Sequence, residues 1–349
     1  MPEFHVIAKD ALLELVEGML KDMPVMGPKE REDQPGFHYF GWLSSPEEFV
    51  AEYVTTTMPP KKAFFPPSQI LFTYELNHSP VLFDATESSR FALVGVHPCD
   101  LAAIDQLDFA YGYPPADACW QRERERGTII GIDCMPDEYC FCATVQTCNA
   151  RKPADVFLTG IERGYFAEVL TTRGSDVLNH CCLSAPTERD LQDVQNWQEA
   201  KTRATTAKFD VSISEFADIL QEGGLSPVWH DVANRCYSCG SCNTTCPTCF
   251  CFDVTDDLEL DLRHGARKRT WDSCQLLEFA LVAGPHNFRG ERWQRVRHRW
   301  HRKFLYLYRK YGRPYCTGCG RCSRACTVDI NIVDVTNQLI EYSRRGEEP

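Results

Sequence analysis

The chain has 349 residues, 43% of them hydrophobic, which is enough for about two domains with substantial cores. Its formal net charge of −12 at pH 7 argues against a nucleic-acid-binding protein, because phosphate recognition requires a basic surface. No apolar run approaches the ~20 residues of a membrane-spanning helix, and the first ten residues lack the basic and apolar regions of a signal peptide. We therefore expect a cytoplasmic protein with no membrane span and no nucleic-acid partner.

The first half of the chain predicts mixed helices and strands. An amphipathic helix is expected over residues 4–21, and the proline- and charge-rich stretch 24–35 predicts a loop. Short apolar or β-branched runs predict strands at 70–75, 91–96, 128–132 and 157–159, and helices are expected at 100–109 and 190–207. This alternation favours layered α/β structure.

From about residue 234 the chain becomes cysteine-rich in two bursts, with a segment between them that we expect to be helical. We predict an α+β fold with two domains. The first, 1–225, is a mixed α/β domain with room for an extra iron–sulfur site. The second, 226–349, is a two-cluster ferredoxin-like domain with a helical insertion over about 255–312.

Each burst follows the spacing C-x₂-C-x₂-C-x₃-C of bacterial ferredoxins. Three thiolates two residues apart can wrap one cube, and the fourth cysteine of each run then ligates the other cluster. The predicted ligands of cluster one are Cys236, Cys239, Cys242 and Cys326, and those of cluster two are Cys316, Cys319, Cys322 and Cys246. Both would be [4Fe-4S] clusters. Thr327 stands where proline usually follows the run, which changes the local backbone and removes no ligand.

Structural zinc and disulfides are the competing interpretations of these cysteines. Zinc sites usually combine two well-separated C-x₂-C pairs, and disulfides favour secreted chains, so both fit the spacing poorly.

Cysteines outside the two runs form less regular groups. Cys99, Cys134, Cys140 and Cys142 follow predicted strands and either converge on a third [4Fe-4S] cluster, with Asp100 as a substitute ligand, or are buried thiols. Cys249, Cys251 and Cys274 are either packing residues, which we favour, or part of a further metal site. No ligand spacing connects Cys119, Cys148, Cys181 and Cys182, which we interpret as ordinary thiols.

Ten lysine and arginine residues lie between 289 and 313, interleaved with aromatic residues. Such a stripe can bind nucleic acid or form a solvated helix face. In this chain we prefer a third interpretation, in which cations offset the negative charge of thiolate-bound clusters or dock an acidic partner.

The chain has no glycine-rich dinucleotide motif, P-loop, nucleophile elbow or H-E-x-x-H motif. It therefore offers no motif of its own for nicotinamide, flavin or ATP, and donor and acceptor chemistry should lie on partner chains.

Several stretches resemble the iron–sulfur beta subunits of NAD(P)-linked [NiFe]-hydrogenases, or sulfhydrogenases, and also the iron–sulfur electron-transfer subunit of anaerobic sulfite reductase. They are residues 60–67, 95–104, 140–142, 236–253, 271–274, 286–289 and 315–332. The resemblance covers most of the chain from about residue 59. It implies a subunit that links a flavin- and NAD(P)-binding subunit to hydrogenase small and large subunits, or to a sirohaem sulfite reductase subunit, and it strengthens the case for a third cluster.

The leading hypothesis is an electron-transfer subunit without a substrate site of its own. The second is a subunit that reduces a sulfur substrate at an unusual cluster, and the third is a regulatory or scaffolding iron–sulfur protein.

Overall fold

The computed structural model describes residues 3–76, 81–84, 89–284 and 286–346. Within these residues, seven strands form a mixed sheet in the order β1-β9-β8-β7-β6-β2-β3. The strands are β1 (Glu3–Ala8), β2 (Val25–Arg31), β3 (Gln34–Trp42), β6 (Phe91–Val96), β7 (Gly127–Ile132), β8 (Val156–Ile161) and β9 (Gly164–Val169). The strands β2, β6, β7 and β8 are parallel, whereas β3 and β9 are antiparallel to their neighbours and β1 is antiparallel to β9.

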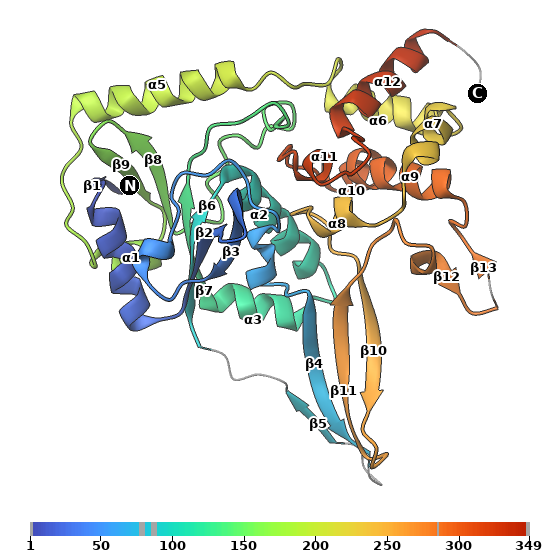
Figure 1. Cartoon of the computed structure of the whole chain (residues 1–349), viewed down its shortest axis with the longest axis horizontal. Helices are drawn as coiled ribbons and strands as arrows, with labels where there is room; N and C mark the ends of the chain where they lie inside the picture. The colour runs from blue at the N-terminus through green and yellow to red at the C-terminus, as the bar shows by residue number, and fades with distance from the viewer. Residues whose placement is uncertain (1–2, 77–80, 85–88, 285, 347–349) are drawn as a thin grey trace.

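Helices cover both faces of this sheet (Figure 1). Along β6, Ala92 and Val94 pack in the core with α1 (Ala11–Asp22), while Leu93 and, beyond the register shift at Gly95, Val96 pack in the core with α2 (Pro98–Gly112). The helices beside the sheet are α1 (Ala11–Asp22), α2 (Pro98–Gly112), α3 (Ala118–Arg126), α4 (Thr172–Leu178) and α5 (Glu188–Ala204). The parallel strands are therefore buried on two sides, as such strands usually are.

A second hydrophobic core lies among the C-terminal helices. Phe216, Trp229, Trp300 and Phe304 are buried together there, and Phe141 joins them from the first half of the chain. These helices are α6 (Ile213–Glu222), α7 (Val228–Arg235), α8 (Ser241–Thr244), α9 (Arg292–Trp300), the π-helical segment His301–Tyr306, α10 (Leu307–Tyr311), α11 (Arg321–Arg324) and α12 (Ile332–Arg344). Short 3₁₀ helices span Pro46–Glu48, Pro60–Ala63 and Glu278–Ala280. The predicted domain boundary near residue 225 stays a prediction.

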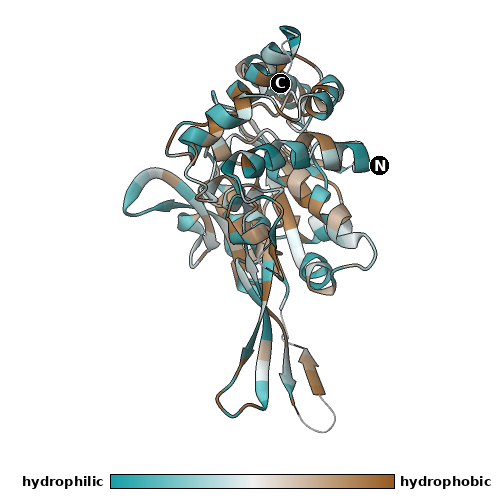
Figure 2. Ribbon diagram, turned by 90° about the vertical axis from the view of Figure 1, so that its right-hand side faces the viewer, coloured by the Kyte–Doolittle hydropathy of each residue, from teal (hydrophilic) through white to brown (hydrophobic). Residues whose placement is uncertain are grey.

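An antiparallel sheet projects from the body of the molecule (Figures 1 and 2). Its order is β10-β11-β4-β5, with β4 (Ser68–Glu75), β5 (Val81–Asp84), β10 (Phe252–Leu258) and β11 (His264–Trp271). The small hairpin of β12 (Leu281–Val282) and β13 (His286–Asn287) follows. The projecting sheet joins a strand from the first half of the chain to a hairpin between the two cysteine runs.

The α+β class and the four predicted strands are confirmed, as are the helices at 100–109 and 190–207. The helix over 4–21 was wrong in its first part, because Glu3–Ala8 pairs with β9 and the helix begins after Asp10, whose carboxylate accepts from Ala11 N. The loop over 24–35 was also wrong. Pro28 is tolerated in β2 because the pairing with β6 involves only Val25 and Met26.

In the described part of the insertion between the cysteine runs, the predicted helical structure spans Arg292–Tyr311, with the short 3₁₀ helix Glu278–Ala280 before it. The structure differs over 252–287, where two hairpins form. Strand β10 is exposed throughout, and ion pairs such as Arg267–Asp256 join it to β11. In β10 the alternation of apolar and polar residues breaks at Asp256, so the sequence offers only a weak strand signal there.

Candidate metal centre

Each cysteine run folds into a tight loop followed by a one-turn helix. Gly240 and Gly320 immediately precede α8 and α11, with φ of +81° and +69°, and glycine adopts this left-handed conformation without a steric penalty. The two short helices contact each other. Two segments far apart in sequence therefore form similar loops that face one another.

One cavity collects the four predicted ligands of cluster one. It is lined by Cys236, Cys239, Cys242 and Cys326, and it also reaches Cys322. Backbone N–H groups already point at two of these sulfurs, since Ser238 N lies 3.3 Å from Cys236 Sγ and Ile330 N lies 3.4 Å from Cys326 Sγ. Such N–H···S bonds stabilise thiolates and tune cluster potentials. The crossed arrangement, with the fourth thiol supplied by the second run, fits this cavity.

The predicted ligands of cluster two are more deeply buried. Cys246 and Cys316 are 7% and 8% exposed. Burial raises the pKa of Cys316 to about 12; Lys303 opposes this, while the neighbouring Cys322 and Cys246 add to it. Burial likewise raises the pKa of Cys319 to about 11, and the neighbouring Cys246 and Cys322 add to this increase. The structure thus places Cys246 beside the second run, as the crossed arrangement requires.

Several of these thiols hold their protons unless a metal displaces them, whereas hydrogen bonding from Cys249 and the nearby Lys303 keep the pKa of Cys246 well below its usual value. Burial raises the pKa of Cys242 to about 12, as it does for Cys316. A bound metal takes the place of these protons, because thiolates are its ligands. A set of convergent soft thiol donors, most of them at least partly buried and supplied with N–H donors, fits an iron–sulfur cluster.

The basic run turns three of its cations inward. Arg295, Arg299 and Lys303 are spaced by four residues along one helix face, and each is at most 6% exposed. Lys303 Nζ lies 3.2 Å from Cys246 Sγ and 2.9 Å from the carbonyl oxygen of Tyr315. Arg299 donates to the carbonyl oxygen of Cys242 at 3.4 Å. This arrangement agrees with cations that offset thiolate charge.

Three of the four upstream cysteines also converge. Burial raises the pKa of Cys140 to about 12, and Cys134 and Cys319 are the next causes. Burial likewise raises the pKa of Cys99, with Asp100 and then Cys319 as the next causes. Cys99, Cys134 and Cys140 therefore gather beside the second cysteine run. Asp100 accepts from both guanidinium nitrogens of Arg321, at 2.6 and 2.7 Å, and this engages the carboxylate considered as a substitute ligand.

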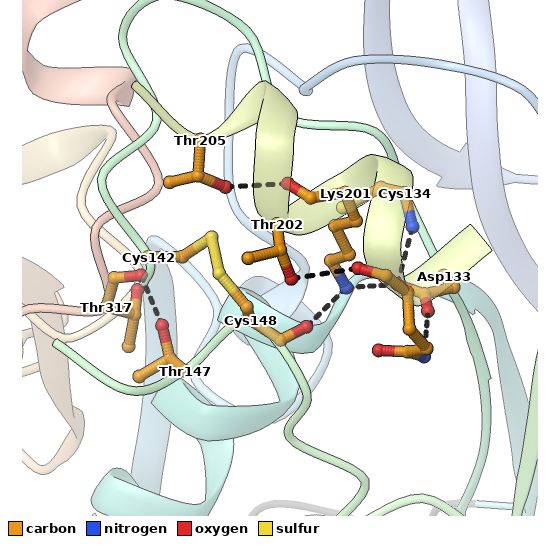
Figure 3. Close-up of a disulfide and its surroundings, with 10 residues drawn as sticks. Asp133, Cys134, Cys142, Thr147, Cys148, Lys201, Thr202, Thr205 and Thr317 are labelled. Carbon is orange, nitrogen blue, oxygen red and sulfur yellow. Dashed lines mark hydrogen bonds and ion pairs between the residues drawn. A yellow bond between two sulfur atoms is a disulfide. The ribbon is translucent and has the colours of Figure 1, made fainter. Parts of the chain in front are cut away.

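The fourth member of the upstream set has a different partner. Cys142 forms a disulfide with Cys148 (Figure 3). The sequence pattern indicated that Cys148 is an ordinary thiol. The loop between them is tied to the second run, because Thr147 Oγ1 donates to the carbonyl oxygen of Thr317 at 2.7 Å. The buried Lys201 donates to the carbonyl oxygen of Cys148 and pairs with Asp133 (Figure 3). The structure thus brings together three of the four cysteines proposed for the third cluster.

Two further residues support the site but were missed by sequence reasoning. Lys61 is 2% exposed and donates to the carbonyl oxygens of Cys246 and Cys249 from the 3₁₀ helix Pro60–Ala63. Asn243 donates to Cys274 Sγ at 2.9 Å. Lys61 belongs to a stretch singled out only by resemblance, and no spacing rule indicated its function.

Among the described residues, no helix combines the length and apolar character that crossing a membrane requires. A family model described as a 4Fe-4S dicluster domain matches residues 235–330, which include both cysteine runs. The chain is also 35% identical over 308 residues to sulfhydrogenase 2 subunit beta of Pyrococcus furiosus. That alignment covers 86% of this chain and 89% of the relative.

Proposed function

Because the chain belongs to the sulfhydrogenase beta-subunit family, we propose that it relays single electrons between a flavin- and NAD(P)-binding subunit and a [NiFe]-hydrogenase module of small and large subunits. The coarser assignment, an iron–sulfur electron-transfer subunit of a hydrogenase-type complex, follows from the family and from the dicluster domain. The observation that supports the proposal is that Cys326 of the second run lines one cavity with Cys236, Cys239 and Cys242, while Cys246 of the first run lies beside Cys316 and Cys319.

The chain's own residues give the relay its properties. A [4Fe-4S] cluster, when bound, takes up and releases one electron. Cys246 and Cys316 lie away from water, while Lys303 and Arg299 supply positive charge beside the thiols. Helices α8 and α11 contact each other, so two clusters bound by the runs would lie close together. The described residues include 17 free thiols, which persist in a reducing compartment. The proposal therefore places the protein in the cytoplasm.

The test begins with anaerobic purification and a count of iron and acid-labile sulfide per chain. About eight irons with two coupled EPR signals after dithionite reduction support two ferredoxin-type clusters, and about twelve would add a third centre, for which Cys99, Cys134 and Cys140 are one candidate ligand set. Zinc without sulfide would contradict the relay.

Serine variants test the crossing. Cys326→Ser should abolish one reduced-state signal and Cys246→Ser the other, while the exposed Cys182→Ser serves as the matched control. If Cys326→Ser and Cys246→Ser remove the same signal, the crossed assignment is wrong.

A subunit with its own sulfur-reducing cluster is the second candidate function. Because Cys142 is in a disulfide, a third cluster held by Cys99, Cys134 and Cys140 would have one position without a protein thiol. A cavity lined by Tyr53 and Trp197 also reaches Cys134. This candidate predicts polysulfide reduction by the dithionite-reduced chain alone. Absence of turnover would leave the relay, whose catalytic partner is either the hydrogenase module or a sirohaem sulfite reductase subunit.

A further inference from the structure

A group of three thiols outside both ferredoxin-type runs meets at the base of the projecting hairpin. Phe252 of β10 pairs with Trp271 of β11, and Asp272 N donates to the carbonyl oxygen of Cys251 at 3.0 Å. The hairpin thus brings Cys251 against the turn that carries Cys274. Cys249 lies two residues before Cys251, in the segment that leaves the first run.

These thiols line a cavity of their own, separate from the one that holds the first run. The lining includes Cys249, Cys251 and Cys274 together with Arg299, Arg302 and Lys303. Cys274 is 3% exposed and accepts a hydrogen bond from Asn243 Nδ2 at 2.9 Å. Three soft donors and three cations therefore face a single enclosed space.

The charges of this cavity are unbalanced when its thiols are neutral. Arg299 is 4% exposed, and within the part of the chain that the structure describes its Nε finds no hydrogen-bond acceptor. Lys303 contacts Cys246 Sγ. A thiolate at Cys246 would offset only one of the three positive charges that line the cavity. Burying unpaired charge is unfavourable, so the lining matches an anionic group with several sulfur atoms.

We propose that Cys249, Cys251 and Cys274 hold an additional iron–sulfur centre, beside the ferredoxin-type pair and distinct from the set at Cys99, Cys134 and Cys140. The inference rests on the proposed relay and deepens it. Cys246 is assigned to cluster two, so the new centre has three protein thiolates and one position for a ligand that is not cysteine. Its place between the first run and the hairpin makes it an entry or exit point for electrons on that side of the molecule.

The first experiment compares the metal content of variants of the full chain purified anaerobically. The double variant Cys251→Ala/Cys274→Ala should lose about three to four irons and a similar number of sulfides, with the two ferredoxin-type EPR signals retained. Cys182→Ser is the control and should lose none. An unchanged iron count would show that the three thiols only pack, and zinc loss instead of iron would also overturn the inference.

A milder variant keeps the proposal testable if the double variant does not fold. Arg302 lines this cavity, does not line the cavity of the first run, and stacks on Phe250 at 4.8 Å. Arg302→Gln keeps every thiol and should lower the reduction potential of one centre while the ferredoxin-type centres titrate as before. Equal potentials for all centres in wild type and variant would contradict the assignment.

The two proposals fail in different ways. If the wild-type chain binds no iron, the relay itself is wrong. If Cys326→Ser and Cys246→Ser each abolish a signal but Cys251→Ala/Cys274→Ala changes neither iron nor spectrum, only this inference fails.

Discussion

Gly318 and Gly312 share a left-handed backbone, with φ of +65° and +72°, but differ in their surroundings. A Cβ on Gly318 would lie 2.5 Å from the backbone nitrogen of Cys142, whereas one on Gly312 would meet nothing within 4 Å. We expect Gly312→Ala to lose about 1–2 kcal/mol of unfolding free energy from φ alone. Gly318→Ala should lose clearly more and should also lower the iron content, as measured by anaerobic thermal unfolding and iron analysis. Equal losses in both variants would contradict the close packing of this loop.

Asp100 and Arg321 form an ion pair that is at most 2% exposed, and Arg321 also donates to Thr56. Asp100→Asn removes the charge that compensates a buried guanidinium, so we expect a loss of about 3–5 kcal/mol in denaturant unfolding. The control is Asp256→Asn, which breaks the exposed pair with Arg267 and should change stability little. A small effect of Asp100→Asn would mean that water or another acceptor reaches Arg321.

At the scale of single residues, the sequence predicted which cysteines belong together better than it predicted their supporting contacts. Spacing alone grouped the eight ferredoxin-type cysteines, because the loop around a cube has a fixed length. Lys61 reaches the carbonyl oxygen of Cys246 across 185 positions of sequence, and no local pattern encodes such a contact. The Cys142–Cys148 disulfide was missed for a related reason, since Cys142 also lay in a plausible ligand group.

Among the elements, the π-helical segment His301–Tyr306 interrupts the long basic helix where Lys303 contacts the thiols. Segments of this kind often occur at functional sites, since they reposition side chains relative to a regular helix. Lys303 Nζ binds Cys246 Sγ, Thr248 Oγ1 and the carbonyl oxygen of Tyr315. The element therefore delivers a positive charge to a predicted cluster ligand.

Lys303→Gln should lower the reduction potential of the cluster bound by Cys246, because the reduced state loses a stabilising cation. A unit charge about 5 Å away at an effective dielectric constant near 20 contributes about 3 kcal/mol, which is on the order of 100 mV for one electron. Redox titration followed by EPR measures the shift. Lys310→Gln removes the same charge from an exposed position on α10 and should leave the potential nearly unchanged. Equal shifts in both variants would indicate a long-range charge effect.

Elements were predictable where burial shaped their sequence. Strands β6 and β7 are buried throughout and read as continuous apolar runs. Strand β10 is exposed throughout and is held by pairing with β11. Its alternation of apolar Phe252 and Val254 with polar residues breaks at Asp256, so no continuous apolar face marks it as a strand. The same physical difference explains why the buried strands β6, β7 and β8 of the main sheet were anticipated and the exposed strand β10 was not.

At the scale of the whole molecule, the two cysteine runs connect parts of the chain that belong to separate hydrophobic cores. The core of the main sheet contains α1 and the parallel strands, while a separate core contains Trp229, Trp300 and Phe304. Three contacts link the two parts of the chain. They are the Arg321–Asp100 ion pair, the Thr147–Thr317 hydrogen bond, and the packing of Phe141 in the C-terminal core. These contacts involve the loops that carry the predicted ligands, so metal content and long-range structure should be coupled.

Removing the metal should therefore loosen a defined part of the molecule. After anaerobic treatment with an iron chelator and an oxidant, we expect faster amide hydrogen exchange over residues 236–251 and 316–330, because ligand loops lose the bonds that cross-link them. Strands β6, β7 and β8 should keep their protection, since their core contains no predicted cluster ligand. The Cys182→Ser variant, treated in the same way, should match the wild type. Unchanged exchange in the ligand loops would show that thiol packing alone holds them, and loss of protection in β6–β8 would show that the clusters hold the whole fold together.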